Sequence, residues 1–241
     1  MTPDLPRGVI VPVADIDVRL APEIHPFEVA NLPAIAANWQ VEHAANPALF
    51  NGRTVLSSTF ALDGDRLVGI AHPVQYATLL YWRKNRREPG VEHWFGFPAL
   101  VSRDNALIAI RMGRHTANPG RVYFAAGSLE PGDFVDGQAD LHANMVREVR
   151  EETGLDISGV RADANAHLLS KDHATVVFRR FYLEEDAEAV ARRIEAFVAA
   201  ESEPEIDGPV IIRSADDLPD GLSHQMDAII RWHFLGERTP G

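Results

Sequence analysis

Three glutamates placed about one helical turn apart, with a glycine close behind them, constrain this chain more than any other feature. Glu148, Glu151 and Glu152 stand at offsets i, i+3 and i+4, which lie on one face of an α-helix. Carboxylates side by side repel one another, and the dipole at the C-terminal end of a helix disfavours negative charge. Gly154 is suited to ending the helix, because glycine adopts the left-handed conformation without a clash. The pattern indicates a helix end with a positively charged ligand.

Carboxylate oxygens suit hard cations such as Mg²⁺, Mn²⁺ or Ca²⁺. The alternative is a solvated acidic surface that Arg147 and Arg150 partly neutralise. A purely structural helix would more comfortably place lysine or arginine in this last turn, which favours the metal-binding interpretation.

A glycine-containing loop precedes the helix. We expect a strand over residues 121–124 and a loop over residues 125–133, where two glycines and a proline constrain the turns. The helix should begin between Gly137 and Leu141, with Asp136 or Asp140 as its N-cap. Glycines in such a loop let backbone amides approach a phosphate or shape a metal pocket.

The loop and the helix together resemble the Nudix box of the Nudix hydrolase superfamily. That box reads G-x5-E-x7-R-E-U-x-E-E-x-G-U, where U is a bulky aliphatic residue. Residues 147–155 match its second half at every specified position, and Gly127 matches its first glycine. Asp133 stands where the family has glutamate, and thirteen residues instead of seven separate it from Arg147. Some Nudix subfamilies carry insertions here, and we predict a loop insertion over residues 134–139.

The resemblance implies a hydrolase that cleaves the phosphoanhydride bond of a nucleoside diphosphate linked to another group. Its cofactor would be Mg²⁺ or Mn²⁺, which neutralises phosphate charge and lowers the pKa of bound water. The resemblance makes Glu148, Glu151 and Glu152 the metal-binding and catalytic set, with Glu148 and Glu152 ranked first. Gly127 would complete the metal pocket through its backbone, and Arg147 would orient the carboxylates.

Other site residues come from loops outside the box. We expect the general base on a late acidic loop, as Glu205 or Glu203, although such a loop is also typical of plain solvated surface. Arg111 and Arg114, before the box, are candidates for binding substrate phosphates, with a solvated loop as the alternative.

Alternating strand and helix patterns predict an α/β fold, and the resemblance implies a Nudix-type α/β/α sandwich with a mixed sheet. We expect an N-terminal accessory region over residues 1–90, packed on a Nudix core over residues 91–241. Within the first region, a helix is expected to begin with Pro33 in its first turn and to end near Asn46. The patterned segments of the core are strands at 97–101, 106–111, 174–182 and 209–212 and helices at 186–200 and 223–235.

The composition limits the classes of molecule that this chain could bind. A net charge of −12 leaves no basic surface for general nucleic-acid binding. The chain has no cysteine and no apolar run near the ~20 residues of a membrane span, so a cytoplasmic location is expected. The partner implied by the resemblance is a small nucleotide derivative (a nucleotide sugar, ADP-ribose, a dinucleotide or coenzyme A), and a homodimer is allowed. A Nudix-like nucleotide sensor without activity is the alternative function; such domains usually lose box glutamates, which this chain keeps.

Overall fold

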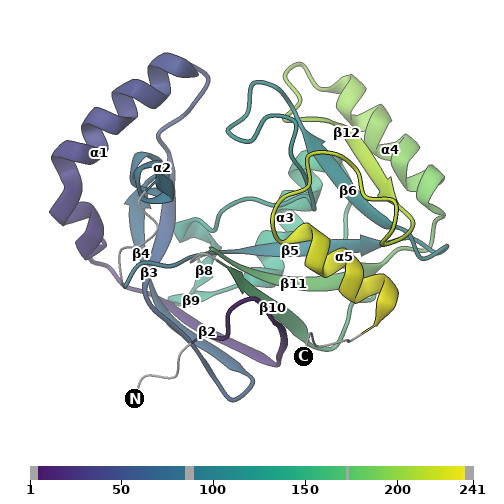
Figure 1. Ribbon diagram of the computed structural model, residues 1–241, viewed down its shortest axis with the longest axis horizontal. Helices are drawn as coiled ribbons and strands as arrows, with labels where there is room; N and C mark the ends of the chain where they lie inside the picture. The colour runs from purple at the N-terminus through teal and green to yellow at the C-terminus, as the bar shows by residue number, and fades with distance from the viewer. Residues whose placement is uncertain (1–4, 85–89, 172–173, 237–241) are drawn as a thin grey trace. The chain divides into compact units, whose positions relative to one another are not determined.

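A computed structural model describes residues 5–84, 90–171 and 174–236 of the chain (Figure 1). Its internal contacts divide the chain into two compact units. The first contains Met1–Phe95, Ser128–Leu141 and Leu168–Val177, and the second contains Gly96–Gly127, His142–His167 and Phe178–Gly241. Two later segments, one of them inside the box, therefore cluster with the N-terminal region.

The first unit contains a five-stranded sheet in the order β3-β4-β2-β9-β8. Strand β2 runs parallel to β4 and antiparallel to β9, so this sheet is mixed. The elements of this unit that precede the box are β1 (Ile10–Val13), β2 (Asp15–Leu20), α1 (Pro26–Ala45), β3 (Arg53–Asp63), β4 (Arg66–Gln75) and α2 (Tyr76–Lys84).

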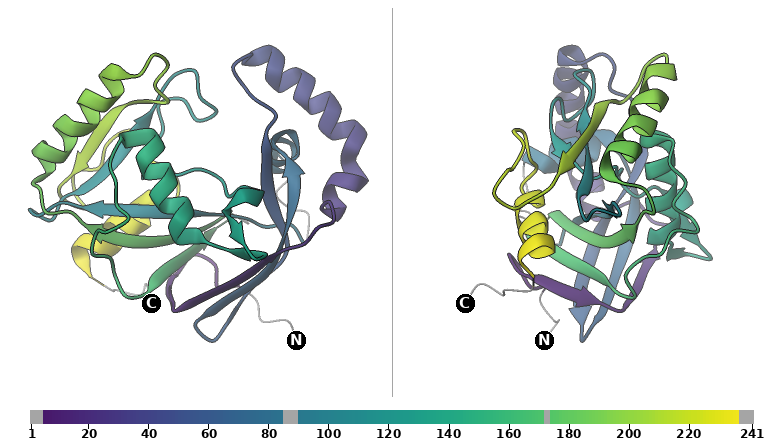
Figure 2. Two further views of the ribbon diagram at one scale, coloured as in Figure 1. Left: turned by 180° about the vertical axis from the view of Figure 1, so that it is seen from behind. Right: turned by 90° about the vertical axis from the view of Figure 1, so that its right-hand side faces the viewer.

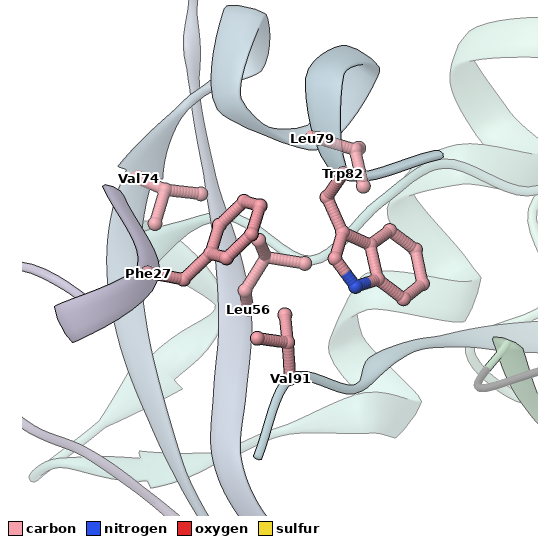
Figure 3. Packing of buried hydrophobic residues seen from close by; sticks show 6 residues of the cluster. All are labelled: Phe27, Leu56, Val74, Leu79, Trp82 and Val91. Carbon is pink, nitrogen blue, oxygen red and sulfur yellow. The ribbon is translucent and has the colours of Figure 1, made fainter. Parts of the chain in front are cut away.

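Apolar side chains from α1, α2 and the sheet form the core of the first unit. Figure 3 shows this cluster, which consists of Phe27, Leu56, Val74, Leu79, Trp82 and Val91. The carboxylate of Glu28 accepts a hydrogen bond from the backbone N–H of Gln75, which ties α1 to the end of β4. Burial of large apolar groups is the dominant stabilising term in such a core.

Helix α1 begins at Pro26 and not at Pro33, so the expected start was wrong. The side chain of His25 caps the helix, because its Nδ1 accepts a hydrogen bond of 3.0 Å from the N–H of Phe27. Pro26 then occupies the first turn, where a missing N–H has no consequence. Pro33 lies inside the helix and has no N–H to donate to the carbonyl of Val29.

The insertion within the box is a hairpin, so the expected loop was also wrong. It consists of β8 (Phe134–Val135) and β9 (Gln138–Ala139), after the short 3₁₀ helix η1 (Pro131–Asp133). Asp136 and Gly137 form the turn, with φ of +50° and +79°. Positive φ at both central residues is typical of a two-residue hairpin turn of type I′. Gln138 pairs with Arg19 of β2, which adds the hairpin to the sheet of the first unit.

The second unit holds the box helix and two further helices. Its strand β6 pairs antiparallel with β12, β5 and β7, and α4 packs on β12 and β6 (Figure 2). The remaining elements of the chain are β5 (His93–Val101), β6 (Leu107–Met112), β7 (Val122–Tyr123), α3 (Leu141–Thr153), β10 (Ala166–Lys171), β11 (Ala174–Tyr182), α4 (Ala187–Ala200), β12 (Ile206–Ile212) and α5 (Met226–Leu235).

A second sheet has the strand order β1-β10-β11-β5-β6-β12, with β7 beside β6. Strands β5, β10 and β11 contribute residues to both units. The predicted α/β class with a mixed sheet is confirmed. No helix among the described residues is long and apolar enough to cross a membrane.

Candidate active site

The box helix α3 is held by its apolar side. Leu141, Met145 and Val149 are all buried, at the 3.6-residue period expected from the sequence. The helix ends at Thr153, as predicted. Gly154 follows with φ +70°, and its N–H donates to the carbonyl of Arg150 at 3.0 Å. The helix therefore ends through a left-handed glycine, which orients its last turn.

The three box glutamates have different environments. The side chains of Glu148 and Glu152 are buried, whereas that of Glu151 is exposed. Arg147 joins two of them, because its Nη1 lies 2.8 Å from Oε1 of Glu148 and 3.0 Å from Oε2 of Glu151.

The glycine loop approaches the helix at these carboxylates. The backbone N–H of Ala126 donates a hydrogen bond of 2.8 Å to Oε2 of Glu152. A Cβ atom on Gly127 would lie 2.5 Å from both carboxylate oxygens of Glu148, which is closer than real atoms approach. Only glycine at position 127 therefore leaves room for Glu148 in this position.

Burial and neighbouring charge disfavour the ionised form of Glu152. Burial raises the pKa of its carboxyl group well above the ordinary value, and the nearby carboxylates of Glu148, Glu205 and Glu151 raise it further. The hydrogen bond from Ala126 acts in the opposite direction and is outweighed. A cation beside Glu152 would reverse this balance, because it would stabilise the ionised carboxylate.

A pocket of about 300 Å³ opens beside the box helix. Its lining combines carboxylates with three apolar residues and contains no lysine, arginine or histidine. The lining residues are Glu148, Glu151, Glu152, Phe197, Val198, Glu201, Glu203, Pro204 and Glu205. The pocket therefore presents six acidic side chains from two separate segments of the chain.

The structure brings the late acidic loop to the box. Glu203 and Glu205, both considered as the general base, line the same pocket as the box glutamates. The carbonyl of Glu205 accepts a hydrogen bond of 2.8 Å from the N–H of Gly113, which fixes the loop just before β12. The charge of Glu205 also acts on Glu152, so the two side chains are close enough to interact.

The structure does not place Arg111 and Arg114 in this pocket. The Nη1 of Arg111 donates to the carbonyls of Gly120 at 3.1 Å and Asp220 at 3.2 Å, which anchors two loops. Arg114 is exposed on the turn after β6 and does not line the pocket. Neither guanidinium therefore offsets the acidic lining in this arrangement.

Asp133, which stands where the Nudix box has glutamate, has a local structural role in the first unit. Its Oδ2 accepts a hydrogen bond of 2.8 Å from the N–H of Glu130 and caps η1. Its carbonyl accepts another of 2.8 Å from Asp140, which closes the base of the β8-β9 hairpin. Asp133 thus holds the insertion in shape.

Sequence reasoning missed two contributors to the site. The amide of Ala126 binds Glu152, although the glycine loop was expected only to approach a phosphate or a metal. Phe197 lines the pocket and also packs on Gly154, where a Cβ would lie 2.4 Å from its ring. Its place on the inward face of an amphipathic helix was the only available signal.

Among the described residues, no group of three or more histidine, aspartate or glutamate side chains is already arranged to hold a metal ion. The ion pair of Glu148 with Arg147 directs one of its carboxylate oxygens to the guanidinium.

Comparisons with known proteins give distant likenesses. No family model and no curated protein sequence matches the chain. Among solved structures, DR0079 from Deinococcus radiodurans is 12% identical with a TM-score of 0.44, over 75% of this chain and 98% of that one. A MutT protein from Methanosarcina mazei is 14% identical with a TM-score of 0.39, over 59% and 92%. The E. coli ORF135 protein is 14% identical with a TM-score of 0.35, over 58% and 88%.

Proposed function

We propose that the chain is a Nudix-type pyrophosphohydrolase, which cleaves a nucleoside diphosphate linked to another group and uses Mg²⁺ or Mn²⁺. One observation supports this most: Glu203 and Glu205, remote in sequence from the box, line one pocket with the box glutamates. If the acidic helix face were only a solvated surface, a second acidic segment beside it would be unfavourable, because like charges repel.

The side chains present fit a divalent cation. All the polar side chains that line the pocket are carboxylates, which suit hard cations, and two of the box carboxylates are buried with like charge nearby. Glu148 and Glu152 would hold the ion, with Glu151 and the backbone of Gly127 completing the site. When bound, the ion would neutralise phosphate charge and make a coordinated water more acidic.

Other residues of the chain would act as the general base, orient the carboxylates and bind the substrate phosphate. Glu205 is the proposed general base, because it lies in the pocket, is exposed to solvent and interacts with Glu152. Arg147 would orient Glu148 and Glu151 through its two ion pairs. Arg114 is exposed, whereas Arg111 is bonded to loop carbonyls, so Arg114 is the better of the two arginine candidates for a substrate phosphate.

The test is a panel of nucleoside diphosphate derivatives, assayed with Mg²⁺ and with Mn²⁺ for released nucleoside monophosphate. The panel contains nucleotide sugars, ADP-ribose, dinucleotides and coenzyme A, with nucleoside monophosphates as substrates that have no phosphoanhydride bond. The proposal predicts metal-dependent hydrolysis of at least one derivative. Binding of the derivatives without hydrolysis of any of them would instead support the nucleotide-sensor function.

A further inference from the structure

The last turn of helix α4 lies against the residue that ends the box helix. A Cβ atom on Gly154 would lie 2.4 Å from the ring of Phe197, so the ring is in direct contact with the backbone that follows Glu152. Phe197 also lines the acidic pocket. Val190 and Ile194, earlier on the inward side of α4, are fully buried and do not line it. Phe197 is therefore the residue of that side that contacts both the box and the pocket.

Residues 201–205 connect α4 to β12 and are held at both ends. The N–H of Glu201 donates a hydrogen bond of 3.2 Å to the carbonyl of Val198 in the last turn of α4. At the other end, the carbonyl of Glu205 accepts its hydrogen bond of 2.8 Å from Gly113, immediately before β12 begins. So short a segment has little reach between two fixed ends, so its position follows that of α4.

The ring of Phe197 thus lies between two groups of carboxylates. Glu152 of the box comes two residues before Gly154, and Glu205 ends the segment that follows α4. The two carboxylates line one pocket, and the charge of Glu205 acts on Glu152. A displacement of about 1 Å between groups that act together in catalysis can cost about 100-fold in rate. The thickness of the ring therefore affects a distance on which the chemistry depends.

We propose that Phe197 is a positioning residue, which holds Glu205 at the distance from the box carboxylates that a general base requires. This inference rests on the proposed function. The ring acts through Gly154 on one side and through the segment after α4 on the other. Without the ring, the end of α4 would either move toward the box helix or leave a cavity, and both change the position of Glu205. The rest of α4 would stay in place, because it packs on β6 and β12.

A double-variant cycle with Glu205 separates positioning from a general loss of stability. With the derivative that the wild type hydrolyses best, Phe197→Ala should lower kcat by about 10–100-fold and change KM by less than about threefold. In a Glu205→Gln background the same truncation should change kcat by less than about threefold, because the residue that Phe197 positions no longer acts as a base. An additive cycle would overturn the proposal.

Ile194→Ala is the matched control for this truncation. Ile194 lies one turn earlier on α4 and is fully buried, so its truncation also removes packing, but it does not line the pocket. Ile194→Ala should keep the kcat of the wild type at a temperature at which circular dichroism shows both variants folded. Equal losses of kcat in Ile194→Ala and Phe197→Ala would contradict a specific role for the ring.

Binding of Mn²⁺, followed by electron paramagnetic resonance, repeats the cycle without turnover. Glu205→Gln should weaken Mn²⁺ binding by about 10-fold, because a carboxylate beside the cation is lost, and Phe197→Ala should remove most of that effect. Phe197→Leu, which keeps an apolar side chain without the ring, replaces Phe197→Ala if the latter does not fold.

The two readouts distinguish failure of the positioning role from failure of the proposed function. A non-additive Mn²⁺ cycle in a protein that hydrolyses none of the derivatives would support the positioning role and contradict the proposed function. Hydrolysis by the wild type with additive cycles in both readouts would do the reverse. A wild-type protein that binds no Mn²⁺ and hydrolyses nothing would overturn both.

Discussion

Replacing Gly154 with alanine should destabilise the protein through two separable effects. The first is backbone strain, because a left-handed conformation at φ +70° costs an L-residue roughly 1–2 kcal/mol. The second is steric, because the new Cβ would lie 2.4 Å from the ring of Phe197 and force it to move. Overpacking of this kind costs about 1–3 kcal/mol. The expected loss in the free energy of unfolding is therefore about 2–5 kcal/mol.

Gly120 provides a matched control for this change. It also has φ +70° and lies in the same unit, but a Cβ there would meet no atom within 4 Å. Gly120→Ala should therefore lose only the strain of about 1–2 kcal/mol. Urea unfolding followed by circular dichroism measures both variants.

A double variant isolates the contact with Phe197. In Gly154→Ala combined with Phe197→Ala, the clash is absent, so the two changes should cost about 1–3 kcal/mol less together than the sum of their separate costs. If Gly154→Ala and Gly120→Ala lose the same free energy, or if the double variant is additive, the packing of Gly154 on Phe197 is not as described.

Three further predictions follow from other parts of the chain. Gly127→Ala should reduce metal-dependent turnover by about 10–100-fold, because its Cβ displaces the carboxylate of Glu148, whereas Gly132→Ala, with no atom within 4 Å, should not. His25 is buried and its pKa is lowered from 6.5 to about 4, so below pH 6.5 the unfolded chain binds a proton that the folded chain does not. Stability should fall as the pH drops from 6.5 toward 4 by about 3 kcal/mol, and His25→Asn, which keeps a capping acceptor, should remove that part of the dependence in urea titrations. Deletion of residues 1–90 should leave a chain that aggregates, because segments 128–141 and 168–177 belong to the first unit; a dispersed NMR spectrum from the fragment would contradict this.

Local patterns were enough to predict the box helix. The 3.6-residue spacing of Leu141, Met145 and Val149 and the glycine at position 154 determine its inner face and its end, and both are as expected. These signals are short-range, so they can be interpreted from the sequence without knowledge of the tertiary structure.

The insertion depended on a contact that is distant in sequence, whereas the start of α1 depended on a local cap by a histidine, which is not among the usual N-cap residues. Asp136-Gly137 is a typical hairpin turn, but its flanking strands have only two residues each and are stable because β9 pairs with β2. Pro33 looked like a first-turn proline, but His25 and Pro26 provide an earlier cap. In both places a correct prediction required the partner strand or the cap to be known first.

The pocket was only partly predictable for the same reason. The sequence identified acidic residues in the box and in the late loop, and the fold decides which of them meet. The ion pairs of Arg147 and the loop contacts of Arg111 could not be assigned from spacing, because both depend on where the neighbouring loops lie. Asp133 forms hydrogen bonds with Glu130 and Asp140 at the base of the hairpin, which its spacing from Arg147 did not reveal.

Replacing Glu152 should have opposite effects on stability and on activity, and this difference tests the proposed metal site. Glu152→Gln keeps an oxygen that can accept the hydrogen bond from Ala126 but removes a charge that burial and neighbouring carboxylates disfavour. Glu195→Gln, on the exposed side of α4, removes one charge outside the pocket and is the control.

The decisive measurement is hydrolysis of the preferred nucleoside diphosphate derivative as a function of Mg²⁺, together with urea unfolding of the metal-free proteins. We expect Glu152→Gln to lose turnover by orders of magnitude while its metal-free form is at least as stable as the wild type, and Glu195→Gln to behave as the wild type in both assays. Full Mg²⁺-dependent activity in Glu152→Gln would contradict the proposal that this carboxylate holds the catalytic cation.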